Sequence, residues 1–280
     1  MNGSAPDDQF KQFYDGALEV IEAWETSRAR DDGKLTLRKA RQRRKVVGIN
    51  LRVTTVTLAL ASHVVTLSKH IFDGLEDGRV LESIPVIRTS YETALTAQWV
   101  RLLGDDAASA IINTYRRKQD VLQKEMSRSE NPTIRGASDD FPGLELADFP
   151  TQSQEQAKRF QQMTEDLDQG KEMYLYYRIM CDFSHVSVSI MDHYFSEDPS
   201  VELGTIYRHQ PKQPSRELWS FFALQSLCLA LAPLAELLPD KTLRKALRSV
   251  AKSCGLTTEL TLSRKYWQRL RMQHDRRHGE

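Results

Sequence analysis

The sequence has little cysteine, and its cysteines do not form a framework. Only Cys181, Cys228 and Cys254 occur, far apart and within helical patterns. An odd, widely spaced set predicts neither a disulfide framework nor a zinc site, and it suits a reducing compartment. The first ten residues carry no basic segment followed by an apolar run, so we expect no secretory signal and a cytoplasmic location.

Short motifs that mark common enzyme classes are missing too. The chain contains no Walker loop, Gly-x-Gly-x-x-Gly, His-Glu-x-x-His, Cys-x-x-Cys or Gly-x-Ser-x-Gly. These absences exclude nucleotide-driven, zinc-protease and α/β-hydrolase chemistry. A di-iron bundle needs two Glu-x-x-His pairs, and only the pseudo-pair Asp182-x-x-His185 is present, so we predict no metal and no cofactor.

The chain also lacks an excess of charge of either sign. Lys and Arg total 39 against 38 Asp and Glu, so no global field attracts nucleic acid or an anionic membrane. Any RNA or DNA contact must come from a local strip, for which Arg38–Lys45 and the basic C-terminal segment are available. Such runs are more often solvated helix faces, and both interpretations stay open.

One uncharged run requires a membrane test. Leu218–Ala235 carries no charge over 18 residues, the lower limit for a spanning helix. Polar residues and Pro233 interrupt it and charged helices follow, which favours a buried core or dimer-interface helix. We expect no stable membrane insertion, and a membrane-associated protein anchored through 218–235 is the weakest hypothesis.

What the sequence does have is helical periodicity, with strand signals nearly absent. Residues 8–28, for example, place apolar side chains at spacings of three and four. We predict an all-α bundle of about eight helices with two long loops. An N-terminal half (1–126), a loop or linker (127–150) and a C-terminal half (151–280) are expected to form one composite domain.

Glycine, aspartate and proline set the expected helix boundaries. A helix that is first basic and then apolar is predicted from about Thr36 to Phe72, and Pro85 is expected in the first turn of the next helix. Residues 171–194 are predicted to be helical, followed by a second loop at roughly 196–215. Three helices are expected after it, at 216–237, at 240–253 and in the basic C-terminal segment.

Polar chemistry is concentrated on the predicted 171–194 helix. Arg178 and His185 are seven residues apart, so on a continuous helix both project from one face, with Cys181 and Asp182 between them. Apolar neighbours indicate that much of this helix is buried, and a charged arginine there needs partners.

An earlier helix offers such partners. Arg88 and Glu92 are spaced i, i+4 on an otherwise apolar segment. Glu92 could pair with Arg88 or reach Arg178 across a helix contact, and a carboxylate from Glu92 or Asp182 near His185 would support a buried proton or a general base. A satisfied structural network explains the same residues equally well.

Arg178 followed by His185 after six residues resembles the R-x(4–6)-H motif of HEPN-superfamily helical domains. Many of these are metal-independent ribonucleases of toxin–antitoxin and antiphage systems, in which the Arg and His of two protomers form a composite site. The resemblance implies an RNA substrate, a homodimer, His185 as acid/base and Arg178 as the group that stabilises phosphorane-like charge.

A second resemblance covers more of the chain. An R-x3-E pair followed by Y-R-x-[LM]-[SC]-x3-H is similar to a bacterial family of uncharacterised all-helical proteins. The matching residues are Arg88, Glu92, Tyr177, Arg178, Met180, Cys181 and His185. That family has no assigned chemistry, so this resemblance implies the fold and the importance of the cluster.

The leading hypothesis is a HEPN-like ribonuclease of bacterial stress or phage defence. Its catalytic residues would be Arg178, His185 and Asp182. Its supporting residues would be Arg88, Glu92, Tyr177 and Cys181. The rival hypothesis is a non-catalytic helical module that binds a partner or small ligand and uses the same cluster structurally.

Overall fold

The computed structural model describes residues 6–29, 41–42, 45–46, 50–141, 147–238 and 241–278. The α-helices in these ranges are α1 (Pro6–Ala29), α2 (Leu51–Glu76), α3 (Val80–Leu103), α4 (Asp105–Ser127), α5 (Pro132–Gly136), α6 (Gln154–Lys158), α7 (Phe160–Glu165), α8 (Gly170–Asp182), α9 (Val188–Tyr194), α10 (Arg216–Leu237), α11 (Thr242–Cys254) and α12 (Arg264–His278). A 3-10 helix, η1, spans Ala137–Asp140. The predicted all-α class is confirmed.

The described residues form twelve α-helices rather than about eight, because α5 lies in the first predicted loop, α6 and α7 are separate short helices, and the predicted helix at 171–194 is divided into α8 and α9. The loop at 127–150 includes α5 and η1. The second loop contains an antiparallel hairpin of β3 (Phe195–Glu197) and β4 (Thr205–Tyr207). These elements are too short to show helical or strand periodicity in the sequence.

The predicted helix start at Thr36 is wrong. Asn50 caps α2 by accepting a hydrogen bond from the Val53 amide (3.1 Å), so this helix begins at Leu51. Before it, β1 (Arg41–Gln42) and β2 (Lys45–Val46) pair as a small antiparallel hairpin. The other residues of the basic run Arg38–Lys45 lie outside the described residues.

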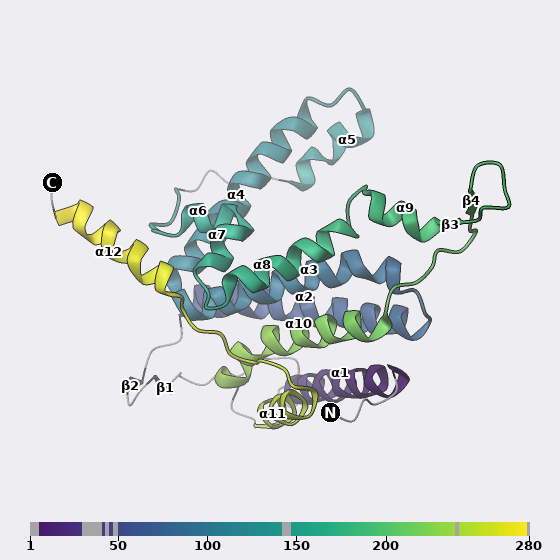
Figure 1. The fold of residues 1–280 in the computed structure, drawn as a ribbon. Coiled ribbons are helices and arrows are strands. Elements are labelled where there is room, and N and C mark those ends of the chain that lie inside the picture. The colour runs from purple at the N-terminus through teal and green to yellow at the C-terminus, as the bar shows by residue number, and fades with distance from the viewer. Residues whose placement is uncertain are drawn as a thin grey trace.

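The core lies where α10 packs across the antiparallel pair α2–α3, with α1 and α11 closing the opposite side (Figure 1). Side chains of α10 such as Trp219, Leu224 and Leu227 are almost fully buried there. The glutamine Gln98 also lies in this core, where its amide donates to the Leu229 carbonyl (2.7 Å).

The predicted position of Pro85 in the first turn of its helix is wrong, because Pro85 is the sixth residue of α3.

Two described helices, α2 and α10, are long and apolar enough to cross a bilayer by length and composition. In α10, 83% of the apolar window is buried within the fold, compared with 33% in α2. The core helix of a folded domain passes the same test, so α10 is a core helix here.

A second group of helices covers α3. Helix α8 runs antiparallel to α3, and α4 leaves the bundle at an angle toward α5 (Figure 1). The corner before α8 is tight, because a Cβ on Gly170 would lie 1.8 Å from the Thr164 carbonyl oxygen. The preceding Gln169 has a left-handed backbone (φ 58°), which is uncommon for a residue with a side chain.

The C-terminal segment with α12 is held against the corner between α7 and α8 by hydrogen bonds and an ion pair. Asp166 is almost fully buried and accepts hydrogen bonds from the Trp99 indole (3.0 Å) and from Arg269 of α12 (2.7 Å). Its backbone carbonyl accepts from the Ser263 amide (2.8 Å). A buried ion pair therefore holds α3, the α7–α8 corner and α12 together.

Candidate functional site

The helix that carries the predicted site ends earlier than the periodicity indicates. Helix α8 stops at Asp182, and α9 starts at Val188, so His185 lies in the turn between them. Hydroxyl groups compete with the helical hydrogen bonds here: Ser187 Oγ donates to the Asp182 carbonyl (2.6 Å) and accepts from the Ile190 amide. The prediction that Arg178 and His185 share one continuous helix face is therefore wrong.

The arginine that meets His185 is Arg88 of α3. Its Nη1 lies 3.1 Å from His185 Nε2 and 3.6 Å from Cys181 Sγ. Its guanidinium carbon lies 5.9 Å from the centre of the Tyr177 ring. Two segments more than 90 residues apart thus bring together four of the predicted residues.

The contact between Arg88 and His185 has one direction available to it. A guanidinium can donate but not accept, so the contact is a hydrogen bond when His185 Nε2 acts as the acceptor. His185 is exposed, and its base nitrogen therefore stands next to a fixed cation at the protein surface.

Arg88 has no carboxylate partner within ion-pair distance among the described residues, although it is only partly exposed. Its Nε is buried and, among those residues, without a hydrogen-bond acceptor. An incompletely paired, partly buried cation is costly. The arrangement therefore favours an anionic ligand that would accept from this guanidinium.

Glu92 lies one turn along α3 from Arg88. Burial raises the pKa of the Glu92 carboxyl above its usual range, and nearby Arg88 and Lys118 lower that pKa only in part. Within the described part of the chain it forms no ion pair with either Arg88 or Arg178. Lys118, on α4, is a neighbour that the sequence did not single out, because it lies on a different helix in an ordinary charged segment.

Tyr177 is held in place by aromatic neighbours. Its ring lies 4.4 Å from that of Phe160 and 5.9 Å from that of Tyr174, measured between ring centres. Burial and a hydrogen bond with Cys181 raise the pKa of the Tyr177 hydroxyl, which therefore stays protonated near neutral pH. Tyr177 provides a fixed, uncharged surface beneath Arg88.

The structure does not bring Arg178 and Asp182 into this cluster. Arg178 is exposed and forms no hydrogen bond or ion pair to any described residue. The Asp182 carboxylate accepts from the Ser189 hydroxyl and so stabilises the turn between α8 and α9. No group of three or more His, Cys, Asp and Glu side chains suited to a metal ion occurs among the described residues.

A family model described as a family of unknown function (DUF5677) matches residues 54–202, more than half of the chain. The chain belongs to this family. The DUF5677 segment begins in α2 and ends in the loop between β3 and β4, so it contains Arg88, Glu92, Tyr177, Cys181 and His185. Membership agrees with the predicted resemblance to an all-helical family without assigned chemistry.

No curated protein and no solved structure matches the DUF5677 chain. No HEPN family model matches it either, so the HEPN resemblance stays a hypothesis.

Replacing Glu92 by glutamine should leave the unfolding midpoint equal or higher near neutral pH. A carboxyl whose pKa is raised by folding is penalised when ionised, and this penalty grows as the pH rises from the unfolded value, about 4.3. The difference between variant and wild type should therefore vanish below about pH 4. Thermal melts at several pH values, with the exposed Glu82→Gln as control, measure it. A lower midpoint for Glu92→Gln at neutral pH would contradict the burial argument.

Proposed function

We propose that this DUF5677 protein is a metal-independent endoribonuclease of bacterial stress or phage defence, acting in the cytoplasm. Its centre would be Arg88 and His185, rather than Arg178 and His185. The observation that supports this most is the Arg88 guanidinium, which has no carboxylate within ion-pair distance among the described residues and whose Nη1 lies 3.1 Å from His185 Nε2.

The chemistry follows if a phosphate oxygen replaces His185 Nε2 as the hydrogen-bond acceptor of the Arg88 guanidinium. A phosphodiester bound to Arg88 would accept from the guanidinium in place of His185, which frees Nε2 to take the proton of an RNA 2′-hydroxyl. The 2′-oxygen bonds to phosphorus as the bond to the 5′-oxygen breaks. The products are a 2′,3′-cyclic phosphate and a 5′-hydroxyl end, which takes its proton from solvent. Arg88 stabilises the charge that develops on phosphorus.

The direct test is cleavage of a labelled RNA by the purified chain in excess EDTA. Cleavage with cyclic phosphate and 5′-hydroxyl ends is expected, and a DNA strand of the same sequence should be untouched because it lacks the 2′-hydroxyl. Absence of RNA cleavage under these conditions, or cleavage that requires a divalent metal, would refute the proposal. In that case the rival, a helical module that binds a ligand, would gain support.

A homodimer is part of this proposal. Large apolar side chains are exposed along α8, α9 and the β3–β4 hairpin, on both sides of His185, and the hairpin projects from the bundle (Figure 1). The set comprises Leu175, Ile179, Val186, Val188, Met191, Phe195, Leu203, Ile206 and Tyr207. Such a concentration marks an interaction surface, and a second copy docked there would bring an exposed Arg178 near the site.

Adding a charge to this surface should dissociate the dimer. We expect Leu203→Asp and Val188→Asp to weaken self-association by at least about tenfold, because each would bury an unpaired carboxylate. Val121→Asp is the matched control, since Val121 is an exposed apolar residue of α4. Light scattering after size exclusion measures the mass. A wild-type chain that stays monomeric at high concentration would contradict the dimer.

A further inference from the structure

A cavity of about 190 Å³ lies between α3, α8, α10 and the segment that follows α11. It has room for roughly six water molecules, and so for a small organic ligand. Four aromatic side chains contribute to its wall: Tyr91 of α3, Tyr176 of α8, and Phe221 and Phe222 of α10. The cavity is separate from the Arg88 cluster, which lies at the other end of α8.

The aromatic wall is closely packed. The ring centres of Tyr176 and Phe222 are 5.3 Å apart, those of Phe221 and Phe222 are 5.6 Å apart, and Tyr91 packs edge-on against Phe222 at 6.3 Å. Tyr91 is only 2% exposed. Burial raises the pKa of both tyrosine hydroxyls, so the rings stay uncharged near neutral pH. Their faces carry the negative side of an aromatic quadrupole.

One charged residue, Glu172, lines this cavity, and no basic residue does. One of its carboxylate oxygens accepts from the Tyr176 hydroxyl (3.1 Å), which leaves the other oxygen without a side-chain donor among the described residues. The Gln225 amide is already used, because it donates to the Thr257 carbonyl (2.5 Å) and accepts from the Thr257 amide (3.0 Å). It thereby fixes the segment that closes the cavity.

We propose that this cavity binds a small organic ammonium ion. Aromatic side chains attract a cation, and the second carboxylate oxygen of Glu172 supplies the opposite charge at the exposed edge of the cavity. An anionic ligand would lie next to the Glu172 carboxylate, with no basic side chain in the wall to offset the repulsion.

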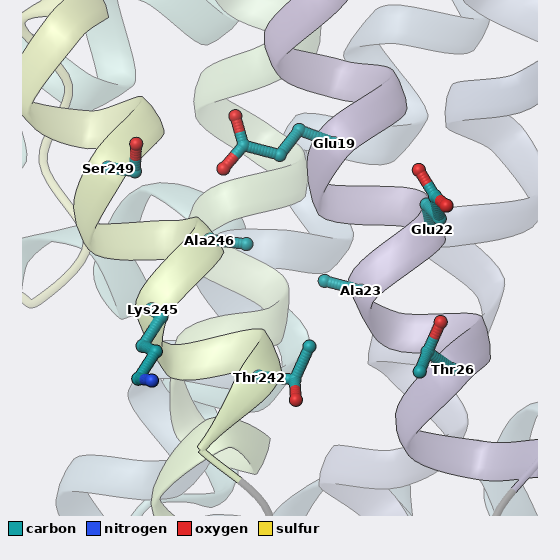
Figure 2. A pocket seen from close by; sticks show the side chains of 8 residues that line it. All are labelled: Glu19, Glu22, Ala23, Thr26, Thr242, Lys245, Ala246 and Ser249. Atoms are coloured by element: carbon teal, nitrogen blue, oxygen red, sulfur yellow. The ribbon is translucent and has the colours of Figure 1, made fainter.

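A second groove in the molecule, which has carboxylates but no aromatic lining, serves as a comparison for cation binding. Figure 2 shows the groove between α1 and α11, where the carboxylate of Glu19 extends between the helices and Ala23 faces Ala246. This groove is larger, about 580 Å³, and it also offers carboxylates, but no aromatic side chain lines it. Carboxylates alone in an open groove stay hydrated and bind a cation weakly.

The test is calorimetric titration of the full chain with three probes. Choline carries a quaternary ammonium group, butylammonium a primary one, and 3,3-dimethyl-1-butanol is the neutral analogue of choline. We expect saturable binding of choline or butylammonium, and affinity for the neutral analogue at least about tenfold lower. The cation that binds more tightly identifies the ammonium class.

Glu172→Gln should lower cation affinity at least about tenfold, whereas the matched Glu19→Gln should leave it unchanged. Tyr176→Phe keeps the ring and should retain most of the binding. Circular dichroism verifies that each variant is folded, and the exposed position of Glu172 makes its loss compatible with folding. The proposal would be overturned if the neutral analogue bound as tightly as the better of the two cations, if Glu172→Gln and wild type bound that cation equally, or if no probe bound saturably.

Discussion

Arg88→Ala is expected to lower the rate of RNA cleavage by at least about 100-fold, with the fold preserved. The substitution removes the only described guanidinium in contact with His185, and with it the group that would hold phosphate and stabilise charge on phosphorus. His185→Ala should cause a loss of similar size, roughly 100- to 10,000-fold, because the general base is removed. Single-turnover cleavage of a labelled RNA measures both.

Two further variants distinguish a site built on Arg88 and His185, as the structure places them, from one built on the Arg178 and His185 of the sequence motif. Arg88→Lys keeps the charge but loses the fork that matches phosphate geometry, so it should recover only part of the activity. Arg178→Ala should have a smaller effect than Arg88→Ala, since Arg178 is exposed and contacts none of the cluster in the described chain. Full activity of Arg88→Ala combined with inactivity of Arg178→Ala would reverse this assignment.

Asp166→Ala should lower the free energy of unfolding by roughly 3 kcal/mol. The change removes the ion-pair partner of Arg269, whose side chain is mostly buried. It also removes the hydrogen-bond acceptor of the Trp99 indole N–H, which is enclosed by the core. Urea unfolding followed by circular dichroism measures the loss.

Neighbouring residues offer matched controls for that loss. Asp166→Asn keeps an oxygen for Trp99 but loses the charge, so its effect should be intermediate. Glu165→Gln breaks an exposed pair with Lys265 in the same two segments and should cost less than about 0.5 kcal/mol. Equal losses for Asp166→Ala and Glu165→Gln would show that burial of the Asp166–Arg269 pair is unimportant.

The long helices were predictable because each has a continuous apolar face. The predicted helix at 216–237 coincides with α10, and the one at 240–253 nearly coincides with α11. The end of α8 was not predictable from periodicity. Apolar residues continue past Asp182. The helix ends there because the Ser184 and Ser187 hydroxyls donate hydrogen bonds to backbone carbonyls in the turn, in competition with the helical backbone amides.

The sequence identified most of the cluster but assigned the wrong arginine to His185. Tyr177 and Cys181 are four residues apart and face α3 together, whereas Arg178 is rotated by about 100° from Tyr177 and points elsewhere. Only the packing of α8 on α3 shows that Arg88 reaches His185. The aromatic cavity had no sequence signal, because its wall combines residues as distant as Tyr91 and Phe222.

Helix α10 has a consequence for how this family can be studied. The segment that defines the family, 54–202, supplies α2, α3 and α8, but α10 lies beyond it. A fragment trimmed to those limits would present to water the faces of α2 and α3 that α10 covers, including Tyr91, which packs on Phe222, and Gln98, which donates to the Leu229 carbonyl. The segment that the family model matches is therefore smaller than the unit of this chain that buries its own interior.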